Sequence, residues 1–296
     1  MLTPHAVLYS PFLAQLVVTR RCNLACGYCD EYDHVSAPVP LATLMERLGH
    51  LKRLGTMTVE FTGGEPMLNP DLFQAVQSAT RMGFWRRMLI SNATLLTNDA
   101  IRSLNDAGLT DLQVSLDGVH PNPVSHKVLR LRRGGLESLG RLARFRVTLS
   151  AVLGAAPAEE AIDCIRFARA HGFRPRVLLI HDDLGQHISN PEELESVAGA
   201  LDALGIPDQG HYLRTLAAGG PAPFKCRAGS RYLYVNEYGS VLWCSPSAGL
   251  FAKPLANYTR TDLREQFRVR KPCTMRCTLG CARTNSRFDQ WRRQST

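Results

Sequence analysis

Short apolar runs alternate along the chain with longer segments in which apolar residues recur every three or four positions. The first such pair is the run 15–19 and the segment 41–54. One helical face of the second segment is apolar and consists of Leu41, Leu44, Leu48, Leu51 and Leu54. Runs of the first kind are typical of buried strands, and segments of the second kind are typical of amphipathic helices. Pro40 precedes the segment, where a helix tolerates proline best. The chain therefore begins as strand, loop and helix.

The same unit repeats to about residue 205. Further strands are predicted over 57–62, 88–91, 112–116, 147–153 and 177–180, and further helices over 69–81, 97–108, 158–171 and 190–205. Asn69 and Pro70 are predicted to cap and open the second helix. Strands that alternate with helices pair in parallel through right-handed crossovers. Six such units predict an α/β fold, a partial (β/α)6 barrel of the TIM type.

The unusual residues of this region follow the predicted strands. A cysteine-rich loop, 22–29, comes after the first strand, and a glycine-rich turn, 63–66, comes after the second. Polar residues at 91–92 and 115–118 end the third and fourth strands. In a parallel barrel the carboxyl ends of the strands meet at one rim, where the working residues gather. We therefore expect a functional site there.

The pattern changes at about residue 209. The segment 217–223 is rich in glycine and proline and predicts a linker. Residues 232–243 then predict a β-hairpin that turns at Glu237, Tyr238 and Gly239. The sequence thus predicts a partial barrel over 1–208, followed over 209–296 by a linker and a small cysteine-rich domain of hairpin and helix.

Composition and charge narrow the function. The chain has 296 residues, of which 45% are hydrophobic and 21% charged, as in ordinary globular proteins. Its net charge is +9, but the basic residues are spread out and no aromatic-interleaved stripe accompanies them, so nucleic acid is not an expected partner. The sequence has neither an apolar stretch of about eighteen residues nor the layout of a secretory signal. We expect a cytoplasmic protein that is not inserted in a membrane.

The nine cysteines are grouped. Three lie in the loop 22–29, five lie between 226 and 281, and Cys164 stands alone on a predicted helix, as a core thiol would. Cytosolic thiols are kept reduced, so a disulfide framework is not expected. Metal binding or catalysis therefore accounts better for the two groups.

The loop 22–29 has the spacing Cys-x3-Cys-x2-Cys, with thiols at Cys22, Cys26 and Cys29. Structural zinc normally takes four protein ligands, whereas three thiolates on a cubane 4Fe-4S cluster leave one iron open. This motif after a first barrel strand resembles the radical S-adenosylmethionine (SAM) superfamily. The resemblance implies that the open iron chelates SAM, which one electron splits to give a 5′-deoxyadenosyl radical. It also implies a reductant such as flavodoxin or ferredoxin.

Further residues extend the resemblance to the SAM site. Gly63, Gly64, Glu65 and Pro66 match the GGEP motif of the family, which implies contact with the SAM amino group. Tyr28 resembles the aromatic residue that lies against adenine. Ser115 and Asp117 are suited to ribose hydroxyls, and Ser91 and Asn92 are further candidates for cofactor binding. Alternatives remain, because Tyr28 could be a packing aromatic residue and Asp117 could form a turn before Gly118.

The C-terminal cysteines resemble those of another module. Cys226, twelve residues, Gly239, four residues and Cys244 are similar to the opening of SPASM and twitch domains, which hold auxiliary 4Fe-4S clusters. Cys273, Cys277 and Cys281 follow with a spacing that departs from the usual Cys-x2-Cys. Five cysteines, where a full SPASM domain needs seven, favour one auxiliary cluster. One thiol is then spare, either inert or a catalytic hydrogen donor, for which Cys244 is the candidate. A zinc ribbon is the alternative for these five cysteines.

The substrate is inferred less directly. Relatives that modify ribosomal peptides often carry a peptide-recognition domain, and none fits before Cys22. We therefore expect a small natural product, such as a sugar or aminocyclitol, that undergoes epimerisation or dehydrogenation. A ribosomal peptide is the alternative substrate. A non-catalytic iron-sulfur electron carrier is an alternative of another class, against which the GGEP motif argues.

Overall fold

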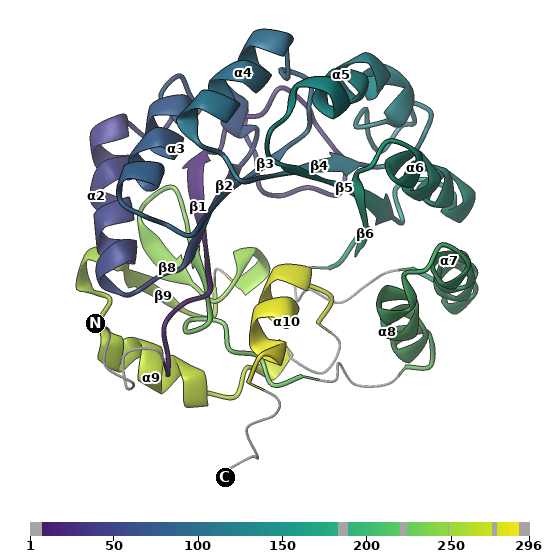
Figure 1. The fold of residues 1–296 in the computed structure, drawn as a ribbon. Coiled ribbons are helices and arrows are strands. Elements are labelled where there is room, and N and C mark those ends of the chain that lie inside the picture. Colours follow the sequence, from purple (N-terminus) through teal and green to yellow (C-terminus); the bar gives the residue numbers. More distant parts are fainter. Residues whose placement is uncertain (1–7, 183–188, 220–223, 248, 274–276, 290–296) are drawn as a thin grey trace.

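Six parallel strands form the main part of one curved sheet (Figure 1). The computed structural model describes residues 8–182, 189–219, 224–247, 249–273 and 277–289. The strands lie in chain order and are β1 (Leu13–Thr19), β2 (Thr58–Gly63), β3 (Arg86–Ser91), β4 (Asp111–Leu116), β5 (Arg146–Leu153) and β6 (Arg174–Leu179). Each overlaps a strand expected from the sequence. The predicted α/β partial barrel is confirmed.

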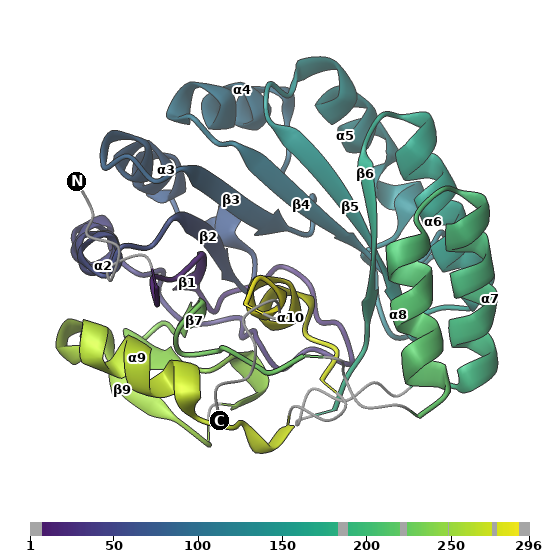
Figure 2. The ribbon, with the colours of Figure 1, turned by 60° about the horizontal axis from the view of Figure 1, so that its bottom comes forward.

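Helices cover the outer face of this sheet (Figure 2). They are α2 (Leu41–Arg53), α3 (Leu72–Arg81), α4 (Asn98–Ala107), α5 (Leu129–Leu142) and α6 (Ala158–Ala170). Two more, α7 (Pro191–Ala203) and α8 (Pro207–Ala217), lie beyond β6. The predicted apolar face of α2 is buried at Leu44, Leu48 and Leu51. Among the described residues no helix is both long and apolar enough to cross a bilayer.

Three details differ from the expected helices. Neither α5 nor α8 was predicted, and both contain glycine and basic residues that interrupt the apolar pattern. Helix α3 begins at Leu72, so the prediction that Asn69 caps it is wrong. The Asn69 side chain is buried, and its Nδ2 donates to the carbonyl oxygens of Val18 at 2.8 Å and Val39 at 3.0 Å. Asn69 therefore joins β1 to the segment before α2.

The C-terminal strands continue the barrel sheet. Strand β7 (Tyr232–Val235) pairs in parallel with β1, and β8 (Ser240–Leu242) and β9 (Ala252–Pro254) follow in antiparallel order. The predicted turn is present, with Gly239 at φ 83°. A separate small domain is not confirmed, because its hairpin belongs to the same sheet. The boundary after residue 208 stays a prediction, and that residue lies within α8.

Two helices and two of the three short 3-10 turns complete the C-terminal part, while the third turn follows β2. Helix α9 (Arg260–Arg268) lies beyond β9, and α10 (Gly280–Arg287) lies on the inner side of the sheet, between β7 and α8 (Figure 2). Single 3-10 turns occur at Pro66–Leu68, Ser245–Ser247 and Leu255–Asn257. Helix α10 therefore covers the side of the barrel that the six parallel strands leave open.

Asp111, at the start of β4, joins the amino ends of three strands. Its carboxylate accepts from Arg86 Nε at 3.0 Å and from Arg146 Nε at 2.9 Å, which begin β3 and β5. Burial raises the pKa of this carboxyl, but bonding to the two guanidinium groups outweighs burial and holds the pKa below its usual value. This ion cluster stabilises the end of the barrel opposite the carboxyl ends of the strands.

Asp111→Asn is expected to lower the free energy of unfolding at neutral pH by about 1 to 2 kcal/mol, because the amide carries no charge for the two arginines. A carboxyl whose pKa is lowered by folding stabilises the protein above its unfolded pKa and loses that effect as the pH falls through the folded pKa. The difference from wild type should thus be full at about pH 7 and shrink below about pH 4. Urea unfolding over this range measures it. Asp163→Asn, in an exposed pair with Arg166, is the control and should change little. An Asp111→Asn variant as stable as wild type at neutral pH would contradict this account.

Candidate active site

The cysteine loop meets the ends of three other strands around one cavity of about 120 Å³. The loop leaves β1 and brings Cys22, Cys26 and Cys29 to the cavity wall. The other expected site residues on this wall are Gly63, Gly64, Ser91, Asn92 and Ser115. They come from β2, β3 and β4 or directly follow these strands. The structure therefore gathers at one rim the residues that the sequence places at strand ends.

The three loop thiols are held by the backbone and by polar neighbours. The Cys29 amide donates to the Cys26 carbonyl oxygen at 3.0 Å, and the Cys22 amide donates to the Asp33 carbonyl oxygen at 2.9 Å. Cys26 Sγ lies 3.3 Å from Ser125 Oγ. Burial raises the pKa of Cys22 and of Cys29, so these thiols are protonated at neutral pH until a metal replaces the proton.

This donor set fits an iron-sulfur cluster. Among the described residues, no three His, Cys, Asp or Glu side chains converge on one metal ion. Three thiols that face one cavity are instead the ligands that a cubane cluster takes on three of its irons. The geometry is thus compatible with the cluster that the motif predicts.

Gly63 and Gly64 are required by the backbone of the cysteine loop. A Cβ on Gly63, whose φ is 132°, would overlap the carbonyl oxygen of Thr19. A Cβ on Gly64 would overlap the carbonyl oxygens of Arg20 and Arg21. These glycines let the end of β2 lie directly against the chain that leaves β1. Their contact with SAM stays a prediction.

Glu65 lies behind the cavity wall and is fully buried. Its Oε1 accepts from Ser91 Oγ and from the Met67 amide, both at 3.0 Å, and its Oε2 accepts from the Asn92 amide at 2.7 Å. Burial raises the pKa of this carboxyl, and the three donors act against that rise. Glu65 therefore ties the end of β2 to the end of β3, while Pro66 begins the 3-10 turn. Direct binding of SAM by Glu65 or Pro66 stays a prediction.

Tyr28 and Asp117 form a buried group with Lys127, a residue that the sequence reasoning missed. The Tyr28 hydroxyl donates to Asp117 Oδ2 at 2.8 Å and accepts from Lys127 Nζ at 2.6 Å. Lys127 Nζ also lies 3.4 Å from Asp117 Oδ2. Burial alone would lower the pKa of Lys127, but Tyr28 and Asp117 outweigh it and raise that pKa above its usual value. Lys127 is thus an ammonium group on the wall of the thiol cavity.

No motif marks Lys127, which lies in the loop between β4 and α5. The available signal is that it is the one Lys or Arg between residues 118 and 128. Asp117 is fully buried, and its Oδ1 has no hydrogen-bond partner among the described residues. A role of Asp117 and Tyr28 at ribose and adenine stays a prediction.

The C-terminal cysteines gather beside the barrel. Cys226, Cys244 and Cys277 belong to one buried cluster, and Cys281 packs against it. Burial raises the pKa of Cys277 to about 12 and that of Cys244 above its usual value. Cys273 is partly exposed. Cys244 is not among the residues that line the thiol cavity, so its role as a hydrogen donor stays a prediction.

Gly63→Ala is expected to lower the free energy of unfolding by about 3 kcal/mol or more, because the new methyl group overlaps backbone and the φ angle is strained. Iron loading should fall with it, since the cysteine loop must move away. Gly134→Ala is the matched control. It lies within α5 with nothing within 4 Å of the new methyl group, and it should be neutral or stabilising by about 0.5 to 1 kcal/mol. Thermal unfolding and iron content measure both, and equal behaviour of the two variants would rule out the close backbone contact.

Known proteins resemble parts of this chain. The model of the radical SAM superfamily matches residues 16–198. The PqqA peptide cyclase of Methylocella silvestris is 31% identical over 199 residues, which are 64% of this chain and 52% of that protein. The PqqA peptide cyclase of Rhodopseudomonas palustris is 36% identical over 111 residues, which are 36% of this chain and 29% of that protein. This chain thus spans about half or less of the length of these relatives.

Solved structures share the fold at low sequence identity. Streptococcus suis SuiB bound to its precursor peptide SuiA has a TM-score of 0.71 and 14% identity, over 96% of this chain and 74% of that one. Native anSMEcpe, with bound AdoMet and the Cp18Cys peptide, has a TM-score of 0.65 and 16% identity, over 92% of this chain and 90% of that one. The family model covers more than half of the sequence and includes the three-cysteine loop and the GGEP motif. This chain therefore belongs to the radical SAM superfamily.

Proposed function

We propose that this radical SAM enzyme modifies a peptide. The observation that carries the proposal is the 31% identity over 199 residues to a protein named PqqA peptide cyclase. The fold it shares with SuiB and anSMEcpe, both solved with bound peptides, supports the same substrate class. These similarities favour the alternative substrate of the sequence analysis, a peptide, over the expected small natural product. The named relatives are enzymes, which disfavours a non-catalytic electron carrier.

The thiol cavity provides the groups that this chemistry needs. Cys22, Cys26 and Cys29 would hold the 4Fe-4S cluster. A cluster held by these thiols would bind SAM at its open iron and would supply the electron for its cleavage into methionine and a 5′-deoxyadenosyl radical. Lys127 is the one charged side chain among the described residues that line the cavity, and it suits an anionic group such as a carboxylate. Leu24 and Ile90 make part of the wall apolar and help to exclude water.

A second cluster site is proposed at the C-terminal thiols. Cys226, Cys244 and Cys277 belong to the buried cluster beside β7 and Cys281 packs against it, so this proposal makes Cys244 a cluster ligand and Cys273 the spare thiol in its place. An auxiliary 4Fe-4S cluster at these four would supply an acceptor for the electron that a peptide radical releases on cross-linking. Such a reaction removes two hydrogen atoms from the peptide, one to the deoxyadenosyl radical and one as a proton with its electron.

The test is an anaerobic reaction of the reconstituted full chain with dithionite, SAM, and either candidate precursor peptides or candidate aminocyclitols. Mass spectrometry then measures 5′-deoxyadenosine and products. The proposal predicts a peptide product about two mass units lighter, formed together with deoxyadenosine. Turnover of an aminocyclitol without turnover of any peptide would return the account to a small-molecule substrate. An iron content near four per chain, where two clusters require about eight, would remove the auxiliary cluster.

A further inference from the structure

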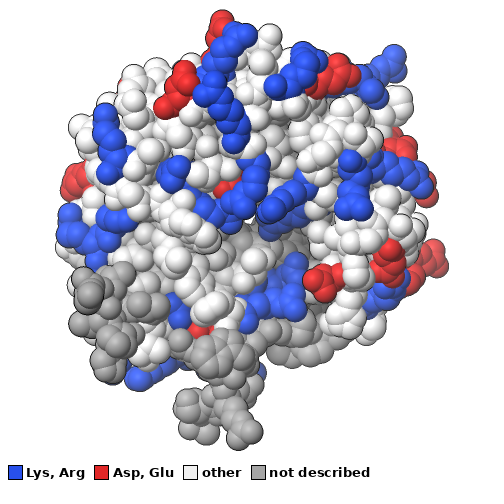
Figure 3. All heavy atoms as spheres, in the orientation of Figure 1, with Lys and Arg blue, Asp and Glu red and all other residues white. Residues whose placement is uncertain are grey.

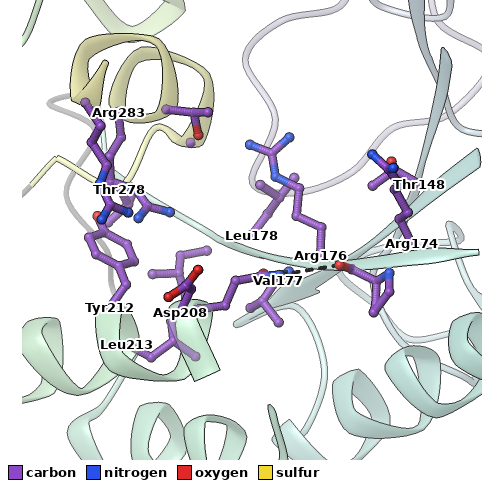
Figure 4. Close-up of a pocket in the computed structure, with 16 residues that line it drawn as sticks. Thr148, Arg174, Arg176, Val177, Leu178, Asp208, Tyr212, Leu213, Thr278 and Arg283 are labelled. Atoms are coloured by element: carbon purple, nitrogen blue, oxygen red, sulfur yellow. Dashed lines mark hydrogen bonds between the residues drawn. The ribbon is translucent and has the colours of Figure 1, made fainter. Parts of the chain in front are cut away.

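A second and larger cavity, of about 320 Å³, lies between β6, α8 and α10 (Figure 4). One wall is the outermost parallel strand, and the opposite wall is the helix that covers the open side of the barrel. None of the residues assigned to the SAM site lines it. The cavity is therefore a separate feature of the molecule.

Positive charge dominates this cavity. Arg174 and Arg176 come from β6, and Arg283 and Arg287 come from α10. Asp208 is the one carboxylate among the described residues that line it. Figure 3 shows basic side chains gathered at a hollow between α10 and α8. The charge of the cavity is complementary to an anionic ligand.

Arg283 is held in place but not neutralised. Its guanidinium carbon lies 3.5 Å from the centroid of the Tyr212 ring, and the Tyr212 hydroxyl donates to the Cys277 carbonyl oxygen at 2.7 Å. Arg283 Nε is buried and has no hydrogen-bond partner among the described residues. Burial lowers the pKa of Arg283, and the nearby charges of Arg287 and Arg176 lower it further. The guanidinium groups of Arg283, Arg287 and Arg176 therefore repel one another, and an anionic ligand between them would offset this repulsion.

Arg176 reaches the cavity from the opposite wall (Figure 4). Its Nη1 donates to Gln113 Oε1 at 2.8 Å, which orients the guanidinium group. A Cβ on Gly280 would overlap Arg176 Nη2, so the absence of a side chain at the start of α10 lets the guanidinium lie there. The two walls therefore present ordered guanidinium groups to the same space.

The strand edge in this cavity is already occupied. Gln209 of α8 accepts from the Val177 amide at 2.9 Å and donates to the Pro175 carbonyl oxygen at 3.4 Å. These are the groups that an added strand would use. A ligand in the cavity is thus recognised by side chains and not by extension of the sheet at this point.

Leu178 relates the wall of this cavity to the neighbourhood of the SAM site. This side chain lines the large cavity and packs against the apolar cluster of Val152, Ala155 and Ile180, against which Tyr28 also packs. Tyr28 is bonded to Lys127, which lines the thiol cavity. The small apolar cluster and Tyr28 therefore connect the wall of the larger cavity with the wall of the thiol cavity, so a segment bound in the larger one could orient a neighbouring residue toward the reaction.

We propose that this arginine-lined cavity binds a carboxylate-bearing segment of the peptide substrate and so positions the reacting residue at the thiol cavity. The inference rests on the proposed function for its substrate class, a peptide. The acidic character of the bound peptide segment is inferred from Arg174, Arg176, Arg283 and Arg287. Binding energy from such a remote segment would orient the substrate for reaction.

The test measures fluorescence anisotropy of short labelled peptides of Gly, Ser and Leu with Glu, Gln or Lys at the same positions. The full chain should bind the Glu peptide at least about tenfold more tightly than the Gln peptide. Arg283→Gln with Arg287→Gln should remove this preference. Arg287→Glu, at an exposed position, should shift the preference toward the Lys peptide. Arg102→Gln, an exposed change on α4, is the matched control and should keep it. Thermal unfolding of each variant checks that it is folded.

Equal binding of the Glu and Gln peptides, or an unchanged preference in folded Arg287→Glu, would overturn the inference. Tighter binding of a short single-stranded RNA, lost in the same variants, would assign the cavity to nucleic acid and overturn it as well. The proposed function is tested separately by the mass-spectrometric assay. Peptides that are modified regardless of their charge would refute only the inference. A Glu preference without modification of any peptide would refute the proposed function and leave the cavity as a carboxylate-binding site with no substrate assigned to it.

Discussion

Cys26→Ala is expected to abolish SAM cleavage and to lower the iron content of the reconstituted chain from about eight to about four per molecule. Cys26 is the buried member of the three thiols in the loop after β1. A cubane cluster with one open iron needs all three protein thiolates, and the remaining two, Cys22 and Cys29, cannot replace the third. Iron and sulfide analysis and the yield of 5′-deoxyadenosine measure the two effects.

The matched control for this result is Cys164→Ala. Cys164 is also a buried thiol, but it lies on α6 and donates to the Gly118 carbonyl oxygen at 3.3 Å. This variant should keep both its iron and its SAM cleavage. Retention of full iron content and cleavage by Cys26→Ala would mean that the loop 22–29 does not hold the catalytic cluster.

Lys127→Met is expected to lower the free energy of unfolding by about 3 to 5 kcal/mol, because it leaves the carboxylate of Asp117 buried without its charged partner. The Tyr28 hydroxyl loses the donor at 2.6 Å, and the thiol cavity loses its one described charged side chain. SAM binding should weaken with it. Denaturant unfolding measures the stability, and equilibrium binding to the reconstituted protein measures the affinity for SAM.

A double-mutant cycle separates the ion pair from simple loss of packing. Lys127→Met combined with Asp117→Asn should cost at least about 1 kcal/mol less than the sum of the single changes, since neither charge is then left alone. Lys253→Met, which breaks a partly exposed pair with Asp262, is the control and should cost about 1 kcal/mol or less. Strictly additive single changes would show that Lys127 and Asp117 do not interact as the structure has them.

Local patterns in the sequence predicted most of the barrel. Apolar runs located all six parallel strands, and helical periodicity located α2, α4, α6 and α7 to within a few residues. Helix α5 was missed because the three arginines and one leucine at 130–133 and the two glycines at 134–135 break its amphipathic pattern. The pairing of β7 with β1 joins residues more than two hundred positions apart, and no local signal marks it. The sequence therefore predicted a hairpin in the C-terminal part but not its position next to β1 in the sheet.

The site residues that belong to contiguous motifs could be predicted from the sequence. Those that reach the site only through the path of the folded chain could not. The cysteine loop and the two glycines are contiguous motifs, and the structure brings them to one cavity. Lys127 approaches Tyr28 and Asp117 only through the path of a loop, so its sequence position gives no indication of its contacts. The preference for a small substrate rested on the length of chain before Cys22, which carries no information on what the cavities accept. Sequence similarity to PqqA peptide cyclases favours the peptide instead.

The central claim is that the three-thiol loop supports reductive cleavage of SAM. The most direct test is the yield of 5′-deoxyadenosine from anaerobically reconstituted wild-type protein given dithionite and SAM, with Cys26→Ala measured beside it. The account predicts deoxyadenosine from the wild type and none from the variant. Absence of deoxyadenosine from wild-type protein that carries its full iron and sulfide, with peptide present, would contradict it.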